Sequence, residues 1–359
     1  MEINTPATAT ELQTLSQRFR KFAESECHDS SPLYEHLSQG IAADDEILAL
    51  AAHCRKGQPS PNLFLAAVHF LLLQGVADPL ASFYPDLSHP SDSPDAAYPA
   101  FREFCLSHRE QVIAIISSRL VQTNEIRRCS YLFPAFSVIA ALAQNRPLAL
   151  IEVGTSAGFN LMWDAYGYRY QYDQEIIDAG RPGSVVQIES SVRGDNRLNL
   201  PLSLPQVQSR TGIDLNIVDL RDDVDSLWLR ALIWPEHDER VKLLQNACPI
   251  IQQAPLNLIS GDAVLLLPGI LEAIPSDAAL VVFHTHTINQ FSAEAKESLT
   301  SILEQIGAKR EVFRLANDIG GGGSNYSALK LVQYHKGQQS EHHLANVDGH
   351  GRWLEWLAN

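Results

Sequence analysis

Ile151-Glu-Val-Gly154-Thr-Ser-Ala-Gly158 is the stretch of sequence that decides the fold. The apolar run Leu148–Val153 has the length and composition of a buried strand, and Thr155 or Ser156 can cap a helix that follows it. Glycines at positions 154 and 158 let the backbone turn without Cβ obstruction, and a helix start offers free N–H groups and positive potential. The stretch therefore predicts a strand, a ligand-binding turn and a helix.

The glycine spacing indicates which cofactor the turn binds. Dinucleotide enzymes usually carry GxGxxG, whose central glycine admits the pyrophosphate. Here an acid precedes the first glycine by two residues, and there is no central glycine. This pattern resembles the first motif of class I methyltransferases, in which the acid faces the amino group of S-adenosylmethionine. We expect this cofactor to be bound by Glu152, Gly154, Thr155, Ser156, Gly158 and Asn160. A tight turn without a ligand is the alternative.

Downstream of the turn, apolar stretches of strand length alternate with helical stretches. The segments 166–172 and 184–188 could pair as a hairpin. The expected strands are 214–220, 256–260, 279–284, 311–315 and 328–335, and the expected helices are 225–232, 237–253, 263–273 and 293–306. Strands separated by helices imply a parallel sheet with crossover helices, and the paired strands at the end suggest an antiparallel edge.

Upstream of Arg146, apolar residues recur at three- and four-residue spacing, which is typical of helices. The expected helices are 10–23, 32–40, 44–53, 61–73, 98–120 and 124–143. A chain of 359 residues fits two domains. We therefore expect an all-α N-terminal domain of residues 1–145, followed by an α/β domain of residues 146–359 that is Rossmann-like and of the methyltransferase type.

Acids at strand ends are candidates for contacts with the cofactor. Asp219, in the run 215–220, is the candidate for the ribose hydroxyls, and Asp262, after the strand 256–260, is the candidate for the adenine side. Asp173 lies nearer the spacing of about 20 residues that follows a glycine loop, but its surroundings indicate a hairpin. Each acid could instead only cap the next helix.

Two histidines follow the expected strand 279–284 and are the catalytic candidates. His284 and His286 would share one strand face, and either could be a general base near neutral pH. One could equally be buried and hydrogen-bonded while the other lies at the surface. No metal is expected, since a third ligand would have to come from the distant His342, His343 or His350.

Composition limits the partners. Acids outnumber bases by 42 to 27 and the formal net charge is -15, so a nucleic-acid substrate is disfavoured and a small molecule or a protein is favoured. The five cysteines are widely spaced without a CxxC pair, which favours reduced thiols in a cytoplasm. The most apolar stretch, 62–76, is too short to cross a bilayer, and the N-terminus does not look like a signal peptide.

Three polar or flexible groups have an open role. The segment 122–125 with Arg127 and Arg128 could be a helix cap or the lid side of the cleft. The segment 234–240 suits the first turn of a helix. Gly320–Gly323, with Ser324-Asn-Tyr326 after it, is expected to be a flexible lid loop. The sequence has no GxSxG elbow, P-loop or HExxH pattern, so the corresponding hydrolase and phosphoryl-transfer classes lose support.

Several stretches in linear order resemble the bacterial family of domain of unknown function 2332. They are 31–34, 61–69, 121–125, 151–161, 212–216 with Asp219, 234–236 with Arg240, and 350–353. Ile217 and Thr285 depart from the family pattern, in which proline and serine are expected. The resemblance implies a methyltransferase-like Rossmann domain, but it supplies no substrate and no catalytic residues.

The sequence is compatible with three functions. The first is an S-adenosylmethionine-dependent methyltransferase in which a histidine removes the acceptor's proton and the helical domain covers the cleft. The second is a binding module that keeps the scaffold without turnover. The third, a nicotinamide oxidoreductase, is disfavoured because GxGxxG is absent.

Overall fold

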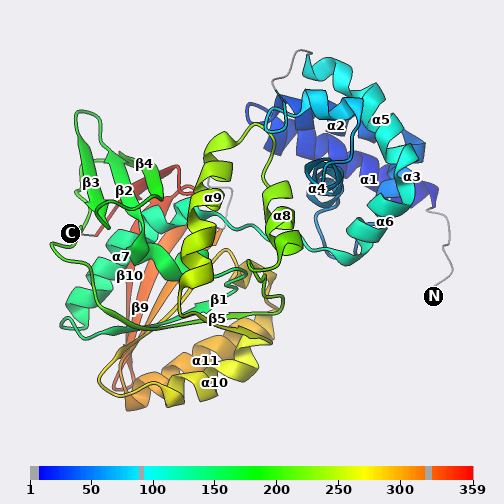
Figure 1. Ribbon diagram of the computed structural model, residues 1–359. Coiled ribbons are helices and arrows are strands. Elements are labelled where there is room, and N and C mark those ends of the chain that lie inside the picture. The colour runs from blue at the N-terminus through cyan, green and yellow to red at the C-terminus, as the bar shows by residue number, and fades with distance from the viewer. Residues whose placement is uncertain (1–7, 89–92, 320–325, 359) are drawn as a thin grey trace. The chain divides into compact units, whose positions relative to one another are not determined.

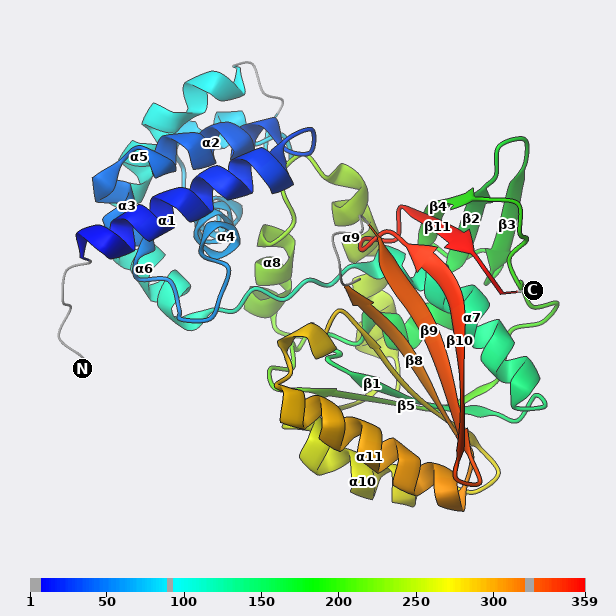
Figure 2. The same ribbon diagram turned by 180° about the vertical axis from the view of Figure 1, so that it is seen from behind.

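The computed structural model describes residues 8–88, 93–319 and 326–358, with backbone alone at 318–319 (Figures 1 and 2). The expected lid glycines at 320–323 lie outside the described residues. The chain forms two compact units. The helical unit comprises Met1–Thr123 and Arg221–Lys242, and the sheet unit comprises Asn124–Leu220 and Leu243–Asn359. The domain boundary expected at residues 145/146 stays a prediction.

The helical unit packs its helices around α4, which is buried along nearly its whole length. Its α-helices are α1 (Ala9–Phe22), α2 (Pro32–Ala42), α3 (Asp45–Ala51), α4 (Ser60–Leu73), α5 (Ala97–Ser107), α6 (Arg109–Ser118) and α8 (Asp223–Ala231). The unit also contains the short helical segments η1 (Ala23–Cys27), η2 (Pro79–Phe83) and η3 (Pro94–Ala96). Trp228 of α8 joins the same core, and its indole donates to the Leu120 carbonyl at 2.8 Å.

The single helix expected over 98–120 is wrong, because the chain breaks it into α5 and α6 at His108. This residue leaves helical geometry with φ -110° and ψ 24°. Its ring stacks on Phe104 at 4.3 Å between centroids, and its Nδ1 lies 3.0 Å from the Phe104 carbonyl oxygen. A side chain that contacts a backbone carbonyl in this way competes with the helical hydrogen-bond ladder.

The sheet unit contains one large mixed sheet. Its strands are β1 (Leu148–Val153), β2 (Gly167–Gln171), β3 (Ile176–Gly180), β4 (Gln187–Arg193), β5 (Val207–Asp214), β6 (Asn257–Ser260), β7 (Ala279–Thr285), β8 (Val312–Ile319), β9 (Ser327–His335), β10 (Gln338–Val347) and β11 (Trp353–Trp356). Their order is β3-β2-β4-β11-β10-β9-β8-β7-β1-β5-β6. Most neighbouring pairs are parallel, which confirms an α/β fold with a mostly parallel sheet.

Two strand predictions are wrong. The hairpin expected between 166–172 and 184–188 does not form: β2 pairs antiparallel with β3, which was not predicted, and β4 lies parallel to β2. The strand expected over 214–220 ends instead at Asp214, because the carboxylate of Asp214 accepts the Asn216 N–H at 2.9 Å and turns the chain there. Strands β10 and β11 were also missed.

Helices cover both faces of the β1–β7 region (Figures 1 and 2). On one face lie α10 (Ala263–Ala273) and α11 (Ala293–Lys309), packed on Ala149, Ile151 and Val153 of β1 and on Leu280 and Val282 of β7. On the other lie α7 (Cys129–Leu142) and the 3-10 segment η5 (Phe159–Ala165), where Phe136 contacts Phe283 at 5.3 Å between centroids. The remaining elements are η4 (Ile126–Arg128), α9 (Asp238–Gln253) and η6 (Ile288–Gln290).

All five cysteines are free thiols. Burial raises the pKa of Cys54 to about 12 and that of Cys248 to about 11. Among the described residues, none of the helices combines the length and the apolar character needed to cross a membrane.

Candidate functional site

The glycine-rich turn extends from the end of β1 to Gly158. Gly154, Ser156 and Gly158 have φ angles of +79°, +49° and +86°, in the left-handed region. A Cβ at Gly154 would collide with the Thr287 side chain, so the turn lies directly against the segment that follows β7. The positions of the two glycines are therefore required by the backbone itself.

The α-helix expected after the turn is wrong. Gly158, with φ +86° in the left-handed region, precedes the 3-10 segment η5, and the start of this segment has no side-chain cap. Thr155, expected as a cap, donates its hydroxyl to Glu152 instead, at 2.8 Å. The Ser156 hydroxyl accepts from the Asn124 side chain at 3.1 Å.

Glu152 is buried at the end of β1, with 1% of its surface exposed. Its carboxyl group accepts hydrogen bonds from Thr155 Oγ1 and from Asn160 Nδ2, the latter at 2.9 Å. Burial raises its pKa from 4.5 to about 8, although the hydrogen bonds from Asn160 and Thr155 offset part of this effect. An opposite charge placed next to this carboxyl group would favour its ionised form.

A chain of hydrogen bonds connects Glu152 to the segment after β10. Asn160 Nδ2 also lies 3.4 Å from Thr285 Oγ1, which accepts from Arg128 Nη1 at 3.3 Å. Arg128 Nε donates to the Gly349 carbonyl at 3.1 Å. These groups come from β1, η5, β7, η4 and the loop after β10, all in the sheet unit.

The acid at the end of β5 is Asp214 rather than Asp219. Asp214 Oδ2 accepts the Ser156 backbone N–H at 2.9 Å, so this carboxylate holds the turn. Asp219 lies beyond the strand with an exposed side chain. It is next to Val218, whose N–H donates to the Ser156 carbonyl at 3.3 Å, so the loop returns to the same turn. Asp173 lies apart, in the connection between β2 and β3.

Asp262 is the N-cap of α10. Its Oδ1 accepts the Val264 N–H at 2.8 Å, and its side chain is exposed after β6. The residue therefore has a structural role, and a contact with adenine stays a prediction.

The two candidate histidines do not share a strand face, because β7 ends at Thr285 and His286 has φ +59°. His284 faces the α11 side and is fully buried, and Arg314 Nε donates to its Nε2 at 3.2 Å. His286 is partly exposed and lies near Gly349. A catalytic role for either histidine stays a prediction.

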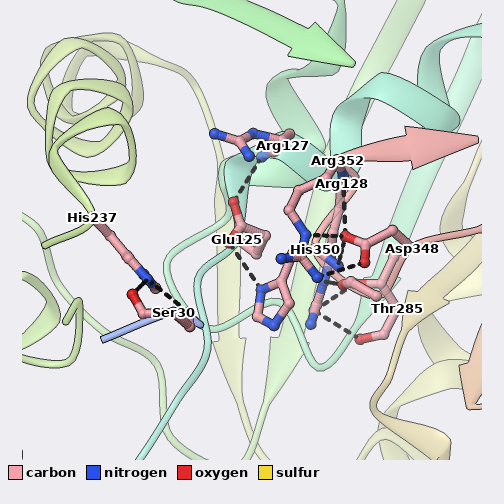
Figure 3. Close-up of polar contacts among 10 residues, drawn as sticks. Ser30, Glu125, Arg127, Arg128, His237, Thr285, Asp348, His350 and Arg352 are labelled. Atoms are coloured by element: carbon pink, nitrogen blue, oxygen red, sulfur yellow. Dashed lines mark hydrogen bonds and ion pairs between the residues drawn. The ribbon is translucent and has the colours of Figure 1, made fainter. Parts of the chain in front are cut away.

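A third histidine, His350, lies at this edge of the sheet and was not predicted as catalytic. Its Nδ1 is 3.1 Å from Glu125 Oε2, and the carboxylate side chain is 2% exposed whereas the imidazole is 50% exposed (Figure 3). Beside it, Arg352 forms a two-bond ion pair with Asp348 at 3.0 and 2.9 Å. Burial opposes ionisation of Asp348, but the hydrogen bonds from Arg352 hold its pKa below the usual value.

Glu125 and His350 each lie in a stretch of sequence that the sequence analysis singled out. Glu125 belongs to the polar segment 122–125, and His350 begins the stretch 350–353 that resembles the family. The two residues are 225 positions apart, so neither stretch alone indicates that they meet.

The polar group at 234–240 serves the helical unit. Glu236 accepts from Ser31 Oγ at 2.6 Å and from the Leu33 N–H at 2.9 Å, which caps α2. His237 Nε2 lies 3.1 Å from Ser30 Oγ (Figure 3). Within the ranges that the structure describes, no group of three His, Cys, Asp or Glu side chains is arranged to hold a metal ion.

Comparison with known proteins identifies the family and gives no activity. A search of curated proteins found no match. The family model described as "Uncharacterized protein conserved in bacteria (DUF2332)" matches residues 16–356, which confirms the resemblance to this family. Because the match covers nearly the whole chain, the protein belongs to the DUF2332 family.

Proposed function

We propose that the sheet unit binds S-adenosylmethionine at the turn Glu152–Gly158 and transfers its methyl group to a small molecule or a protein. The observation that carries the proposal is the position of this turn. From β1 the chain builds β5 and β6 on one side, and it then returns to build β7 and β8 on the other, all parallel. Open α/β sheets bind ligands where the strand order reverses, outside the carboxyl ends of the strands.

The residues at this reversal suit a cofactor that carries an ammonium group and no phosphate. Burial is the largest cause that favours the neutral form of the Glu152 carboxyl group, and the charge of Asp214 adds to it, so a neighbouring ammonium would stabilise the charged form. Asp219 offers an exposed carboxylate beside the turn for the ribose hydroxyls, while Asp214 positions the turn. Asp262 follows β6, the next strand after β5, and in this proposal it would lie near the adenine.

Isothermal titration with S-adenosylmethionine and S-adenosylhomocysteine tests the proposal. We expect both ligands to bind. Asp219→Asn should weaken the binding of each ligand by about tenfold, as the loss of a charged hydrogen bond does. Asp277→Asn is the matched control, because Asp277 is exposed just before β7, at the opposite end of the strands. Absence of heat with either ligand at millimolar concentration would exclude the proposal, and binding of NADH instead would favour an oxidoreductase.

A further inference from the structure

We propose that Glu125 and His350 form a carboxylate–imidazole pair that removes the proton from the methyl acceptor. The inference rests on the proposed function and adds to it the class of acceptor. The acceptor is a nucleophile that carries a removable proton, such as a hydroxyl, a thiol or an amine with an N–H.

The geometry of the pair is that of an oriented general base. The nearly fully buried Glu125 carboxylate holds Nδ1 of His350, which fixes the ring orientation and stabilises the imidazolium once it forms. Half of the imidazole is exposed, and Figure 3 shows its other nitrogen on the side of the ring away from Glu125. Nε2 makes no hydrogen bond with any residue that the structure describes, so it is available to a substrate.

Two connections place the pair at the edge of the sheet that carries the turn. Asn124, the neighbour of Glu125, donates to Ser156 within the turn itself. Gly349, the neighbour of His350, accepts from Arg128, which also contacts Thr285 at the end of β7. The buried His284 has no such access, since it faces α11 and contacts Arg314.

The charged and titratable groups around His350 come from three segments. They are Glu125, Arg127 and Arg128 from the start of the sheet unit, His286 after β7, and Asp348 and Arg352 from the loop of His350 itself. Asp348 and Arg352 neutralise each other, and Glu125 is the carboxylate in contact with the imidazole.

The proposed reaction transfers the methyl group and removes one proton from the acceptor. A lone pair of the acceptor atom attacks the methyl carbon of S-adenosylmethionine, and the carbon–sulfur bond breaks with its electrons going to sulfur, which leaves S-adenosylhomocysteine. The proton of the acceptor passes to Nε2 of His350 and gives an imidazolium beside the Glu125 carboxylate. A base in this position must lie near the sulfonium, whose positive charge S-adenosylhomocysteine lacks.

The ratio of the affinities for S-adenosylmethionine and S-adenosylhomocysteine therefore tests whether the Glu125–His350 pair lies near the sulfonium. This test needs no known acceptor. His350→Lys replaces the imidazole with an ammonium group, and Glu125→Gln removes a carboxylate, so each change makes the pair more positive. Each change is expected to weaken the binding of S-adenosylmethionine relative to that of S-adenosylhomocysteine by about fivefold. This is the effect of one charge several ångströms away at intermediate dielectric. The two changes differ in chemistry, so a folding defect in one leaves the other informative.

Two controls separate this effect from a structural one. His350→Gln introduces no ammonium group and should leave the ratio unchanged. His335→Lys should also leave it unchanged, because His335 is exposed at the end of β9, next to the amino end of β8. If both ligands bind and the ratio stays the same in His350→Lys and Glu125→Gln, the pair is only a tether for its loop and the inference is wrong. If neither ligand binds the unaltered protein, the proposed function fails and the inference fails with it.

Discussion

The two faces of the sheet at the carboxyl ends of β1 and β7 differ sharply in chemistry. The face under α10 and α11 is apolar up to His284, which contacts Arg314. The face under α7 carries a continuous polar network from Glu152 to Gly349. Strand alternation separates Glu152 and Thr285 from His284, because neighbouring residues of one strand point to opposite faces. Residues adjacent in sequence, such as His284 and Thr285, therefore lie on opposite faces of the sheet and make contacts of different kinds.

The largest loss of stability is expected when the polar network between Glu152 and Gly349 loses Arg128, its buried cation. Arg128→Met should lower the free energy of unfolding by roughly 2–4 kcal/mol, because the Gly349 carbonyl and Thr285 lose a charged donor. Urea unfolding, with hydrogen exchange of the β1 and β7 amides, measures the loss. Arg352→Met is the control, since this side chain is 62% exposed and its ion pair contributes less than about 1 kcal/mol. Equal losses in the two variants would contradict a network that depends on Arg128.

The second effect depends on pH. The pKa of Glu152 is raised from 4.5 to about 8 by burial, so the unfolded chain releases this proton at lower pH than the folded one. Stability from this group is full below pH 4.5 and falls as the pH rises towards 8. Relative to Glu152→Gln, the unaltered protein should lose roughly 2–3 kcal/mol between pH 5.5 and 8, given about 1.4 kcal/mol for each pKa unit.

Urea unfolding of the two proteins across this pH range measures the difference, and other titrating groups cancel in the comparison. A constant difference would show that Glu152 ionises normally. The same property predicts proton release when S-adenosylmethionine binds, which titration in buffers of different ionisation enthalpy detects.

A smaller effect is expected on the apolar face. His284→Leu removes the acceptor that Arg314 Nε and Nη2 share, at a cost of roughly 1–3 kcal/mol. The affinity for S-adenosylmethionine should stay within about twofold, since the side chain is fully buried on the face opposite Glu152. Loss of cofactor binding with retained folding would show that the two faces act together.

The smallest effect concerns the cap of α10. Asp262→Ala should cost about 1 kcal/mol, the usual contribution of a helix N-cap, whereas Asp262→Asn keeps the cap. Thermal unfolding measures this difference. If Asp262 also contacts adenine, both variants weaken S-adenosylmethionine binding; if it only caps the helix, neither does.

Local pattern was sufficient for much of the fold. The helix expected over 263–273 coincides with α10, and the strand over 279–284 differs from β7 by one residue, because apolar periodicity and turn residues specify both. The prediction from local pattern failed at β5, because the apolar Leu215 was assigned to the strand but is 78% exposed. The strand that pairs with β1 on the side away from β7 is the more polar run Val207–Asp214, which is specified by its neighbours.

Only part of the candidate site could be predicted from the sequence. Glu152 and Asn160 are eight residues apart, so a single motif contains both. Arg128 and Thr285 are 157 residues apart, and no local pattern reports that they meet. Pairing of distant segments is decided by the topology of the sheet, which sequence periodicity does not encode.

The division of the chain also affects the order in which the protein can fold during synthesis. The helical unit is completed by Arg221–Lys242, and Trp228 and Ala231 of this segment belong to its apolar core. Ribosomes add residues one at a time, and domains generally fold as whole units. The first 123 residues therefore emerge without the segment that closes their core, and they wait until β1 to β5 have been made. A chaperone that shields this unfinished surface would act during that interval, and a pause in translation before residue 242 would prolong it.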